Sequence, residues 1–514
     1  MQFSDLLTNA IHAPPYQAQP HRSLPAEAIE KLRTRISGRV EVPGTDGYDL
    51  GRRLHNPKFN KFPVVIAYCV TEQDIALALQ VARENGIHFA VRSGGHCITG
   101  WSANEGILID LSAFSYVQVD PVARRAWASS GCQFEKLNAA LEVHGLHVPG
   151  GTCADVCVGG YMQGGGYGFT ARIYGMNCDN VEEFRMMLAD GTVIRANASE
   201  NTDLFWAVRG GMGGNYGVLL DVKYRLVALE QISAFSIGWW FDTPEGMNNA
   251  ANALLVMQSE MIRDPSLDRL GFQVAVANQG PTTDSLRPCV MMKAMYAGTA
   301  EEAAQVQRRI ERLTGAEVHY SARGPYAELN DGVMRKPNSI LPLPIATMPN
   351  ESKEARYVAT PMPFEAWHGL LEHFRRAPNP MMIYGIEMYG SQIARGPAEP
   401  NSFAHRQADL DLFCDVFWFR ERDREAMEAH LAIWTRLMEP YWNGGVYPNY
   451  PSRNLSDYRS AYWGGNFSEL LRIKRKYDPD NCFHFSQSLK PRVNEPSTPA
   501  QAGAALPLVS ITAG

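Results

Sequence analysis

The chain is built around one stretch, Gly150-Gly-Thr-Cys-Ala-Asp-Val-Cys-Val-Gly-Gly-Tyr-Met-Gln-Gly-Gly-Gly-Tyr-Gly168. Eight of its nineteen residues are glycine. Because glycine has no Cβ, such a run lets backbone N–H groups approach a ligand closely and at unusual φ and ψ angles. Consecutive N–H groups that point into one concavity bind anions, phosphates above all. The stretch also contains two cysteines, Cys153 and Cys157, and two tyrosines, Tyr161 and Tyr167.

A second stretch, Val91-Arg-Ser-Gly-Gly-His96, has the same character. A strand-like segment leads into a glycine pair, and one nucleophilic side chain, His96, follows. A third glycine cluster lies between Arg209 and Gly217. We interpret the first two stretches as loops that hold one large phosphorylated cofactor between them.

Composition narrows the possible partners. The 514 residues are enough for two or more domains with cores of ordinary size. A net charge of −6 gives no reason to expect nucleic acid or an anionic membrane as a partner. No run of about 18 apolar residues appears, and Met1–Gln17 lacks the basic and apolar regions of a secretory signal. We therefore expect a cytoplasmic protein, monomer or homodimer, that binds small molecules.

The nine cysteines are odd in number and include no CxxC pair, which favours reduced thiols over a disulfide framework. Cys153 and Cys157 form a CxxxC pair, but no further Cys/His pair lies at zinc spacing. The sequence therefore predicts no metal site.

The first 226 residues mix short strands and helices. Pro63–Cys69 has the pattern of a buried strand, and Thr71-Glu-Gln-Asp74 is a capping box that begins a helix. Asn85-Gly86 ends that helix. Farther along, Asp190-Gly191 lies between two strand-like runs and predicts a hairpin. These patterns predict an α+β arrangement in which the glycine clusters occur where strands or helices end.

A different pattern begins near Gln231 and continues to about Tyr441. Strand-like runs alternate with long helical patterns, which predicts one antiparallel sheet covered by helices on one face. The other face is then free to cover a ligand. The predicted strands are Ser236–Phe241, Phe272–Ala277, Val290–Tyr296, Met382–Tyr389 and Leu412–Phe419, and the predicted helices are Glu245–Arg263, Ala300–Leu313 and Arg424–Met438.

Seven motifs, in order along the chain, resemble those of the berberine-bridge-enzyme-like flavoprotein oxidases. These oxidases belong to the vanillyl-alcohol-oxidase superfamily, which has a PCMH-type FAD-binding domain. One glycine motif alone would be a weak signal, whereas the ordered set covers roughly residues 50 to 490. The motifs are Arg92–His96, Cys153–Gly160, Gly164–Gly168, Arg209–Gly217, Ser402-Phe-Ala-His-Arg406, Tyr447-Pro-Asn-Tyr450 and Tyr477-Asp-Pro-Asp-Asn481.

The resemblance implies four segments. Residues 1–228 form the FAD-binding domain, with a PCMH-type core from about 58 to 228. Residues 229–451 form the substrate-binding domain, and residues 452–495 return to the FAD domain. Residues 496–514 are expected to be a flexible tail.

The resemblance also implies FAD attached at two points. His96 would bond to the 8α-methyl of the flavin, and Cys153 to its C6. The alternatives are a His96 that only hydrogen-bonds a loop, and a Cys153 that is a small buried residue. Cys157 stays open as the second attachment site, although alignment of the motif favours Cys153. Tyr161 stands where the family commonly has histidine.

Further residues are expected to contact or shape the cofactor site. They include the glycines of all three clusters and several of their neighbours. The full set is Arg92, Ser93, Gly94, Gly95, Gly100, Cys157, Val158, Gly159, Gly160, Gly164, Gly165, Tyr167, Gly168, Gly217, Val218, Tyr447 and Asn449.

Catalysis requires a base beside the carbon that loses hydride. In similar oxidases the second tyrosine of Tyr-x-Asn-Tyr has this role, which implies Tyr450 here, with Tyr447 behind it. The alternative is that both tyrosines only pack where the domains meet. Tyr167 would polarise the substrate or lower the pKa of Tyr450.

The resemblance implies a second polar catalytic group on the run Met382–Tyr389. Period-two alternation divides this run between two faces and leaves Tyr384 and Glu387 as candidates, one on each face. A solvent-facing glutamate is the alternative for Glu387. His405 and Arg406 match a family motif but are expected to orient loops by charge-assisted hydrogen bonds.

The resemblance implies oxidation of an alcohol carbon, either a sugar hemiacetal or a hydroxyl of a secondary metabolite. Val156, three residues after Cys153, lies where a small residue in plant relatives leaves room for oxygen. It therefore favours an oxidase that forms hydrogen peroxide. The alternatives are oxidative ring closure of an aromatic or alkaloid-type metabolite, and a non-catalytic flavin-binding protein.

Overall fold

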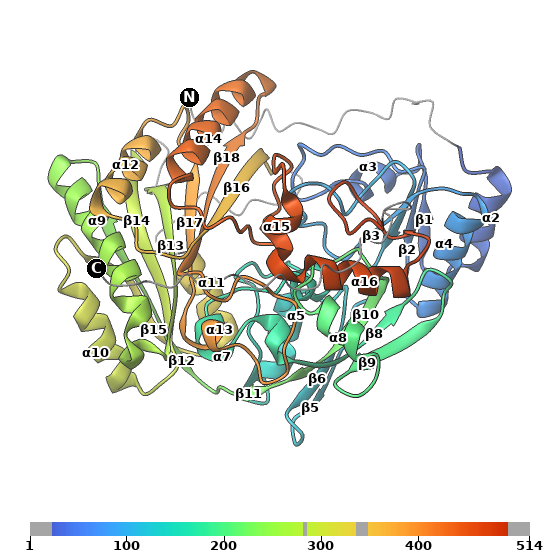
Figure 1. Cartoon of the computed structure of the whole chain (residues 1–514), viewed down its shortest axis with the longest axis horizontal. Helices are drawn as coiled ribbons and strands as arrows, with labels where there is room; N and C mark the ends of the chain where they lie inside the picture. Colours follow the sequence, from blue (N-terminus) through green and yellow to red (C-terminus); the bar gives the residue numbers. More distant parts are fainter. Residues whose placement is uncertain (1–22, 281–284, 336–347, 492–514) are drawn as a thin grey trace, which may run out of the picture.

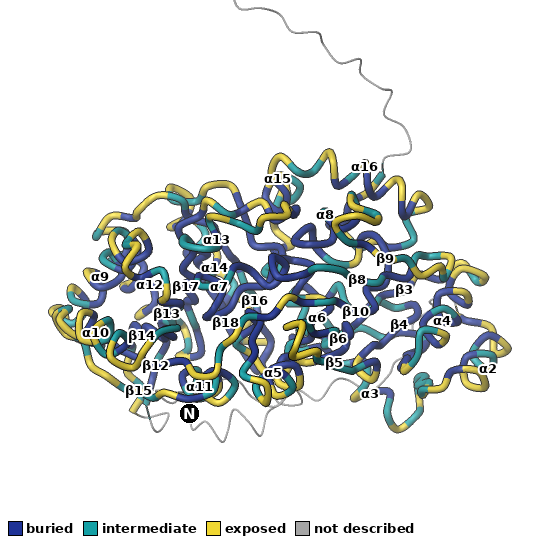
Figure 2. Tube along the Cα trace, turned by 90° about the horizontal axis from the view of Figure 1, so that it is seen from below, coloured by how far each residue is buried: buried dark blue, intermediate teal, exposed yellow. Residues whose placement is uncertain are grey.

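The computed structural model describes residues 23–280, 285–335 and 348–491. The stretch 1–17 and the expected tail 496–514 lie outside these residues. Three main sheets form the molecule (Figure 1), two small ones in the N-terminal half and one larger sheet in the segment that follows. Buried chain fills the centre between them (Figure 2).

The first sheet has the order β1-β2-β4-β3. β1 (Arg39–Glu41) runs antiparallel to β2 (Val65–Tyr68), whereas β3 (Phe89–Arg92) and β2 both run parallel to β4 (Ile107–Asp110). Helix α4 (Glu72–Glu84) connects β2 to β3, and it begins at the predicted capping box of Thr71 and Asp74. The parallel arrangement brings the glycine-rich loop after β3 to one edge of the sheet.

The second sheet has the order β5-β6-β10-β8-β9 and is antiparallel throughout. Its strands are β5 (Val117–Asp120), β6 (Arg125–Ser129), β8 (Val181–Met187), β9 (Val193–Asn197) and β10 (Val218–Arg225). The predicted hairpin at Asp190-Gly191 joins β8 to β9, with Gly191 at φ +87°. Between β6 and β8 the chain forms α5 (Phe134–Glu142), the long glycine stretch and the short helix α6 (Val158–Gln163).

The third sheet has seven antiparallel strands in the order β15-β12-β14-β13-β17-β18-β16. The five predicted strands correspond to β12 (Ile232–Trp240), β13 (Leu270–Gln279), β14 (Arg287–Tyr296), β17 (Ile383–Met388) and β18 (Leu410–Trp418). Two edge strands, β15 (Glu317–Gly324) and β16 (Asn350–Val358), were not predicted. Both are rich in charged and polar residues, so their sequences do not resemble half-buried strands.

Helices cover one face of this sheet, as predicted. They are α9 (Pro244–Ser259), α10 (Ala300–Glu311), α12 (Phe364–Arg375) and α14 (Arg424–Met438), and they share one apolar core with the strands. Figure 1 shows them on the outer side of the sheet. Helix α11 (Tyr326–Arg335) packs at one end of the opposite face. The remainder of that face turns towards the glycine loops.

The C-terminal segment packs against the N-terminal part. Helix α16 (Phe467–Tyr477) contacts α8 (Thr202–Val208), and its buried Lys474 donates to the carbonyls of Asn215 (2.6 Å) and Phe483 (2.7 Å). Asp478 pairs with Lys474 and accepts from the N–H groups of Cys482 and Phe483, both at 2.9 Å. A buried ion pair therefore fixes the turn that follows α16.

A second buried ion pair joins the two halves of the molecule. Arg406 donates to both carboxylate oxygens of Asp179, at 3.0 and 2.6 Å, and Asp179 also accepts from Asn401 (2.7 Å) and the N–H of Met176 (2.9 Å). The expected role of Arg406 in orienting loops is consistent with this pair, in which its guanidinium holds the Asp179 carboxylate. Its neighbour His405 lies against the carbonyl of Tyr462 at 3.0 Å.

We predict that Asp179→Asn destabilises the protein by about 3–5 kcal/mol, because it leaves the guanidinium of Arg406 buried without its carboxylate. Chemical denaturation, followed by tryptophan fluorescence, measures the loss. Arg472→Gln removes an exposed pair with Glu469 and is the matched control, with an expected effect of about 1 kcal/mol or less. Equal effects of the two substitutions would contradict the role of the Asp179–Arg406 pair.

Candidate active site

A cavity of about 730 Å³ lies between the uncovered face of the seven-stranded sheet and the glycine loops. This volume is within the range of cofactor and substrate sites. The loop after β3 and the stretch that begins at Gly150 both line it, as do β13, β14, β17, β18 and the segment 447–453. The two stretches interpreted as cofactor loops are thus brought to one cavity.

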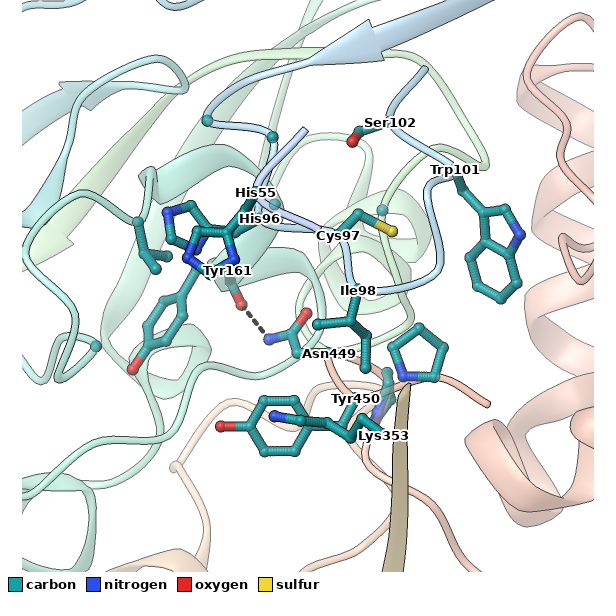
Figure 3. A pocket seen from close by; sticks show the side chains of 18 of the residues that line it. His55, His96, Cys97, Ile98, Trp101, Ser102, Tyr161, Lys353, Asn449 and Tyr450 are labelled. Carbon is teal, nitrogen blue, oxygen red and sulfur yellow. Dashed lines mark hydrogen bonds between the residues drawn. The ribbon is translucent and has the colours of Figure 1, made fainter. Parts of the chain in front are cut away.

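His96 lines the cavity in a group of three side chains. Its Nε2 lies 3.1 Å from Oδ2 of Asp155. The ring of His55 stacks on it with centroids 4.3 Å apart (Figure 3). Burial, followed by the neighbouring His96, lowers the pKa of His55 to about 3, so His55 is neutral. The hydrogen bond with His96 is the main cause that lowers the pKa of Asp155 to about 2.

The two cysteines of the glycine stretch differ in access. Cys153 is exposed and lines the cavity, although it lies deep within the molecule, so its exposure is to the cavity. Burial raises the pKa of its thiol. Cys157 is buried, donates to the carbonyl of Gly131 at 3.4 Å, and has a pKa raised by burial to about 12. The geometry therefore favours Cys153 over Cys157 as the nucleophile that faces a ligand.

Glycine is required where the backbone meets the cavity. A Cβ on Gly94 would lie 2.8 Å from Sγ of Cys157, and Gly95 has φ +77°. Nothing lies within 4 Å of a Cβ on Gly160, so this backbone faces open space. Of the expected cofactor residues, the cavity is lined by Ser93, Gly94, Gly95, His96, Gly100, Cys153, Cys157, Gly160, Tyr167, Gly217, Tyr447 and Asn449.

Seven of the expected cofactor residues do not line the cavity but pack around it. Arg92 is buried, pairs with Asp110 and donates to the carbonyls of Gly51 and Arg53. Its guanidinium therefore braces the loop instead of facing a ligand. The glycines allow close packing: a Cβ on Gly164 would lie 2.1 Å from Asn449. The others are Val158, Gly159, Gly165, Gly168 and Val218.

Tyr450 and Glu387 meet across the cavity wall. The Tyr450 hydroxyl donates to Oε1 of Glu387 at 2.7 Å, while Oε2 of Glu387 is buried with no protein partner among the described residues. Burial is the largest cause that raises the pKa of each group, and Asp411 next to Glu387 adds to it. At rest, therefore, the phenol keeps its proton, and Glu387 is a stronger base than an ordinary glutamate.

A lysine lies over this pair. Nζ of Lys353, on β16, is 4.2 Å from the ring centroid of Tyr450 and 4.1 Å from that of Phe413. Figure 3 shows it across the Tyr450 ring. Lys353 also lies 3.1 Å from Asp415 and 3.9 Å from Glu351, both of which line the cavity. A cation held over an aromatic ring favours negative charge on that ring.

Tyr447 connects the Tyr450 segment to the glycine stretch. Its hydroxyl oxygen accepts from the N–H groups of Gly166 and Tyr167 and from Nδ2 of Asn449, all at 3.0 Å. Tyr167 in turn donates to the carbonyls of Phe272 and Met388 at 3.1 and 3.0 Å. Both hydroxyls therefore hydrogen-bond to backbone groups. The Tyr167 hydroxyl donates only to backbone carbonyls, so in this arrangement Tyr167 shapes the site and does not contact a substrate directly.

Tyr384 does not belong to the site. Period-two alternation on β17 turns Glu387 to the cavity and Tyr384 to the helix-covered core, where its hydroxyl lies 2.6 Å from Nδ1 of His373. The expectation of a catalytic role for Tyr384 is corrected by this position, and Glu387 is the remaining candidate of the two. The alternative of a solvent-facing Glu387 is wrong, because its side chain is 4% exposed.

Sequence reasoning missed several lining residues. Burial and Asp415 raise the pKa of Glu351 to about 8. Burial also raises to about 7 the pKa of Asp411, which does not line the cavity but pairs with Glu387 across β17 and β18. Lys293, on β14, also lines the cavity, and burial lowers its pKa to about 8. The alternation of charged residues on β16, Glu351 and Lys353, is the one sequence signal that could have predicted this lining.

The C-terminal segment closes the other end of the cavity. Phe485 stacks on Trp101 with centroids 4.7 Å apart, and His484 stacks on His88 at 4.2 Å. All four side chains line the cavity. Within the described residues no group of His, Cys, Asp and Glu could hold a metal ion. None of the described helices combines the length and apolar character that a membrane crossing requires.

Comparisons with known proteins find FAD-binding relatives of this chain. Residues 63–197 match the FAD binding domain family, and residues 446–490 match the family described as berberine and berberine like. The FAD-linked oxidoreductase YgaK of Bacillus subtilis is 26% identical over 467 residues, 89% of this chain and 98% of its own. The monolignol oxidoreductase AtBBE-like 13 of Arabidopsis thaliana is 28% identical over 478 residues, 84% of each chain.

Solved structures share the fold. Berberine bridge enzyme from Eschscholzia californica has a TM-score of 0.79 and 21% identity, covering 91% of this chain and all of the other. BBE-like 1 of Physcomitrella patens also has a TM-score of 0.79, with 22% identity over 90% of this chain and 99% of the other.

We predict that Tyr447→Phe lowers stability by about 2–4 kcal/mol, because it leaves two buried N–H groups of the glycine stretch without an acceptor. Chemical denaturation measures the loss, and hydrogen exchange at Gly166 and Tyr167 should accelerate. Tyr441→Phe is the control, because among the described residues the Tyr441 hydroxyl has no hydrogen-bond partner. Unchanged exchange at these two amides would contradict the assigned role of the Tyr447 hydroxyl.

Proposed function

Because the chain belongs to the berberine-bridge-enzyme-like FAD-linked oxidoreductases, we propose that it oxidises the CH–OH group of a small alcohol. Dioxygen would be the final acceptor and hydrogen peroxide the second product. The observation that carries this proposal is the hydrogen bond from Tyr450 to a buried Glu387 on the cavity wall.

The residues of the cavity fit FAD. Two nucleophilic side chains, His96 and Cys153, face one space whose backbone is opened by glycine, and both are proposed to hold the flavin covalently. The aromatic side chains of Trp101 and Phe485, at the other end, provide flat surfaces suited to a ring system. Bound FAD supplies the hydride acceptor that this reaction needs.

Tyr450 and Glu387 handle the proton of the alcohol. A phenol whose pKa is raised cannot act as a standing phenolate. We therefore propose a relay: Tyr450 takes the proton of the substrate hydroxyl as it gives its own proton to Glu387 over 2.7 Å. Lys353 over the ring stabilises the negative charge that develops on Tyr450 during the transfer.

The walls beside Tyr450 favour an aromatic alcohol. Phe413 lies edge-on to Tyr450 with centroids 5.0 Å apart, and Ile383 and Phe417 also line the cavity. One relative is named as a monolignol oxidoreductase. Val156 lines the cavity. Its small side chain supports an oxidase over a dehydrogenase, because it leaves room for oxygen beside the flavin. A peroxide assay across aromatic alcohols and sugars tests the substrate class, and a ring-closed product would identify oxidative ring closure instead.

Replacing Tyr450 by Phe is expected to lower kcat/KM about 10²- to 10⁴-fold, the usual contribution of a positioned acid–base group. Glu387→Gln should give a loss of the same order, because its amide cannot accept the proton. Steady-state peroxide formation measures both, with flavin content determined for each variant. Full turnover by Tyr450→Phe at normal flavin loading would refute the relay, and Tyr441→Phe is the control.

The pH profile should show which group accepts the proton. Below its pKa Glu387 is protonated and cannot accept from Tyr450, so kcat/KM is expected to rise with pH through the pKa of Glu387. Because burial and Asp411 raise this pKa well above 4.5, the limb should lie above that of an ordinary glutamate. Glu387→Gln should remove the limb, and a variant that keeps it would assign the limb to another group.

Mass spectrometry of the denatured chain tests the attachment. The wild-type chain is expected to carry one FAD mass that survives acid precipitation. Cys153→Ser and His96→Ala should each keep one bond, whereas the double variant should carry none. Cys157→Ser should behave as the wild type. A double variant that still carries covalent flavin would exclude His96 and Cys153 as the pair.

A further inference from the structure

The loop that carries Cys153 also carries a carboxylate directed at His96. Asp155 follows Cys153 by two residues, yet the cavity is lined by Cys153 and not by Asp155. The Asp155 side chain is 61% exposed, and its Oδ2 lies 3.1 Å from Nε2 of His96. One short loop thus presents a thiol to the cavity and a carboxylate to the histidine on the opposite loop.

The contact fixes the tautomer of His96. A carboxylate only accepts hydrogen bonds, so its position 3.1 Å from Nε2 favours the neutral tautomer of His96 that carries its proton on Nε2. The other ring nitrogen, Nδ1, then keeps its lone pair and is the nucleophilic atom. Histidine rings that react or bind metals are commonly held in one tautomer by such a carboxylate.

His55 fixes the plane of the same ring. It stacks on His96 at 4.3 Å with an interplanar angle of 27° (Figure 3), and the backbone N–H of His55 donates to the carbonyl of Gly95 at 3.1 Å. Because His55 is neutral, it stacks without placing a second positive charge beside His96. The imidazole is therefore held by a ring on its face and a carboxylate at its edge.

We infer, on the basis of the proposed histidyl attachment, that Asp155 is a positioning residue for the formation of the His96–flavin bond, which the structure assigns to Nδ1. The Nδ1 lone pair would form the new C–N bond in place of one C–H bond of the 8α-methyl, and His96 would release its Nε2 proton once that bond has formed. The two hydrogens and two electrons that are removed pass to dioxygen as hydrogen peroxide. Asp155 holds the Nε2 proton while Nδ1 reacts and stabilises the positive charge that develops on the imidazole.

The test isolates the histidyl bond by using Cys153→Ala as the background. In this background the full-length chain is purified with its FAD, and acid precipitation separates bound flavin into covalent and released fractions after fixed times of incubation in air. Asp155→Asn keeps the size and hydrogen-bonding capacity of the side chain but removes its charge. It is expected to slow covalent incorporation about ten- to a hundredfold, the usual effect of losing such an orienting partner.

Three comparisons make the result specific. Asp155→Glu should restore most of the rate, because it returns the charge. Asp46→Asn, at an exposed aspartate elsewhere, should leave the rate unchanged. The total FAD content and the thermal midpoint of Asp155→Asn should equal those of the background, and peptide mapping with NMR should locate the bond at Nδ1.

The possible failures can be told apart. If the Cys153→Ala background itself never binds FAD covalently, the proposed attachment through His96 is wrong. If that background forms the bond and Asp155→Asn forms it equally fast, the role of Asp155 is overturned while the attachment stands. Loss of FAD altogether in Asp155→Asn would also overturn the inference, because Asp155 would then serve binding. A bond at Nε2 would contradict the tautomer.

Discussion

The arrangement depends on one hydroxyl oxygen, that of Tyr447, which accepts two N–H groups of the glycine stretch and the amide of Asn449. These bonds tie the long glycine loop to the segment that carries Tyr450. Tyr167 extends the connection to the seven-stranded sheet through the carbonyls of Phe272 and Met388. A shift of the seven-stranded sheet would therefore also shift the glycine loop.

This connection explains why the site can use groups from both halves of the chain. Cys153 comes from the loop before α6, Tyr450 from the segment after α14, and Glu387 from β17. The proposed proton transfer from Tyr450 to Glu387 depends on the distance of 2.7 Å between the hydroxyl and the carboxylate. The buried Asp179–Arg406 pair on another side of the contact helps to keep the two halves in register.

Local patterns predicted much of the fold, whereas the partners of the site residues came from elements far apart in the sequence. The capping box at Thr71 and the hairpin at Asp190-Gly191 need only neighbouring residues, and the structure has both. The edge strand β16 was missed because Glu351 and Lys353 look solvent-exposed in sequence. Their side chains are only 9% and 7% exposed, for Lys353 and Glu351 respectively, because that face borders the cavity, which only the sheet order reveals.

The same limit applies to individual side chains of the site. A motif could single out His96 but could not show that His55 stacks on it, because β2, α4 and β3 separate the two residues in sequence. The backbone N–H of His55 donates to the carbonyl of Gly95, next to His96. Tyr384 and Glu387 were equivalent candidates until the sheet showed which face borders the cavity. Sequence motifs can therefore indicate which residues take part in the chemistry. Their partners, however, depend on strand register and on how distant strands pack. The same holds for charge: Lys353 lies near three carboxyl groups, those of Glu351, Glu387 and Asp415, of which only Glu351 is close in sequence. Lys353 lies over Tyr450 because β16 pairs with β18.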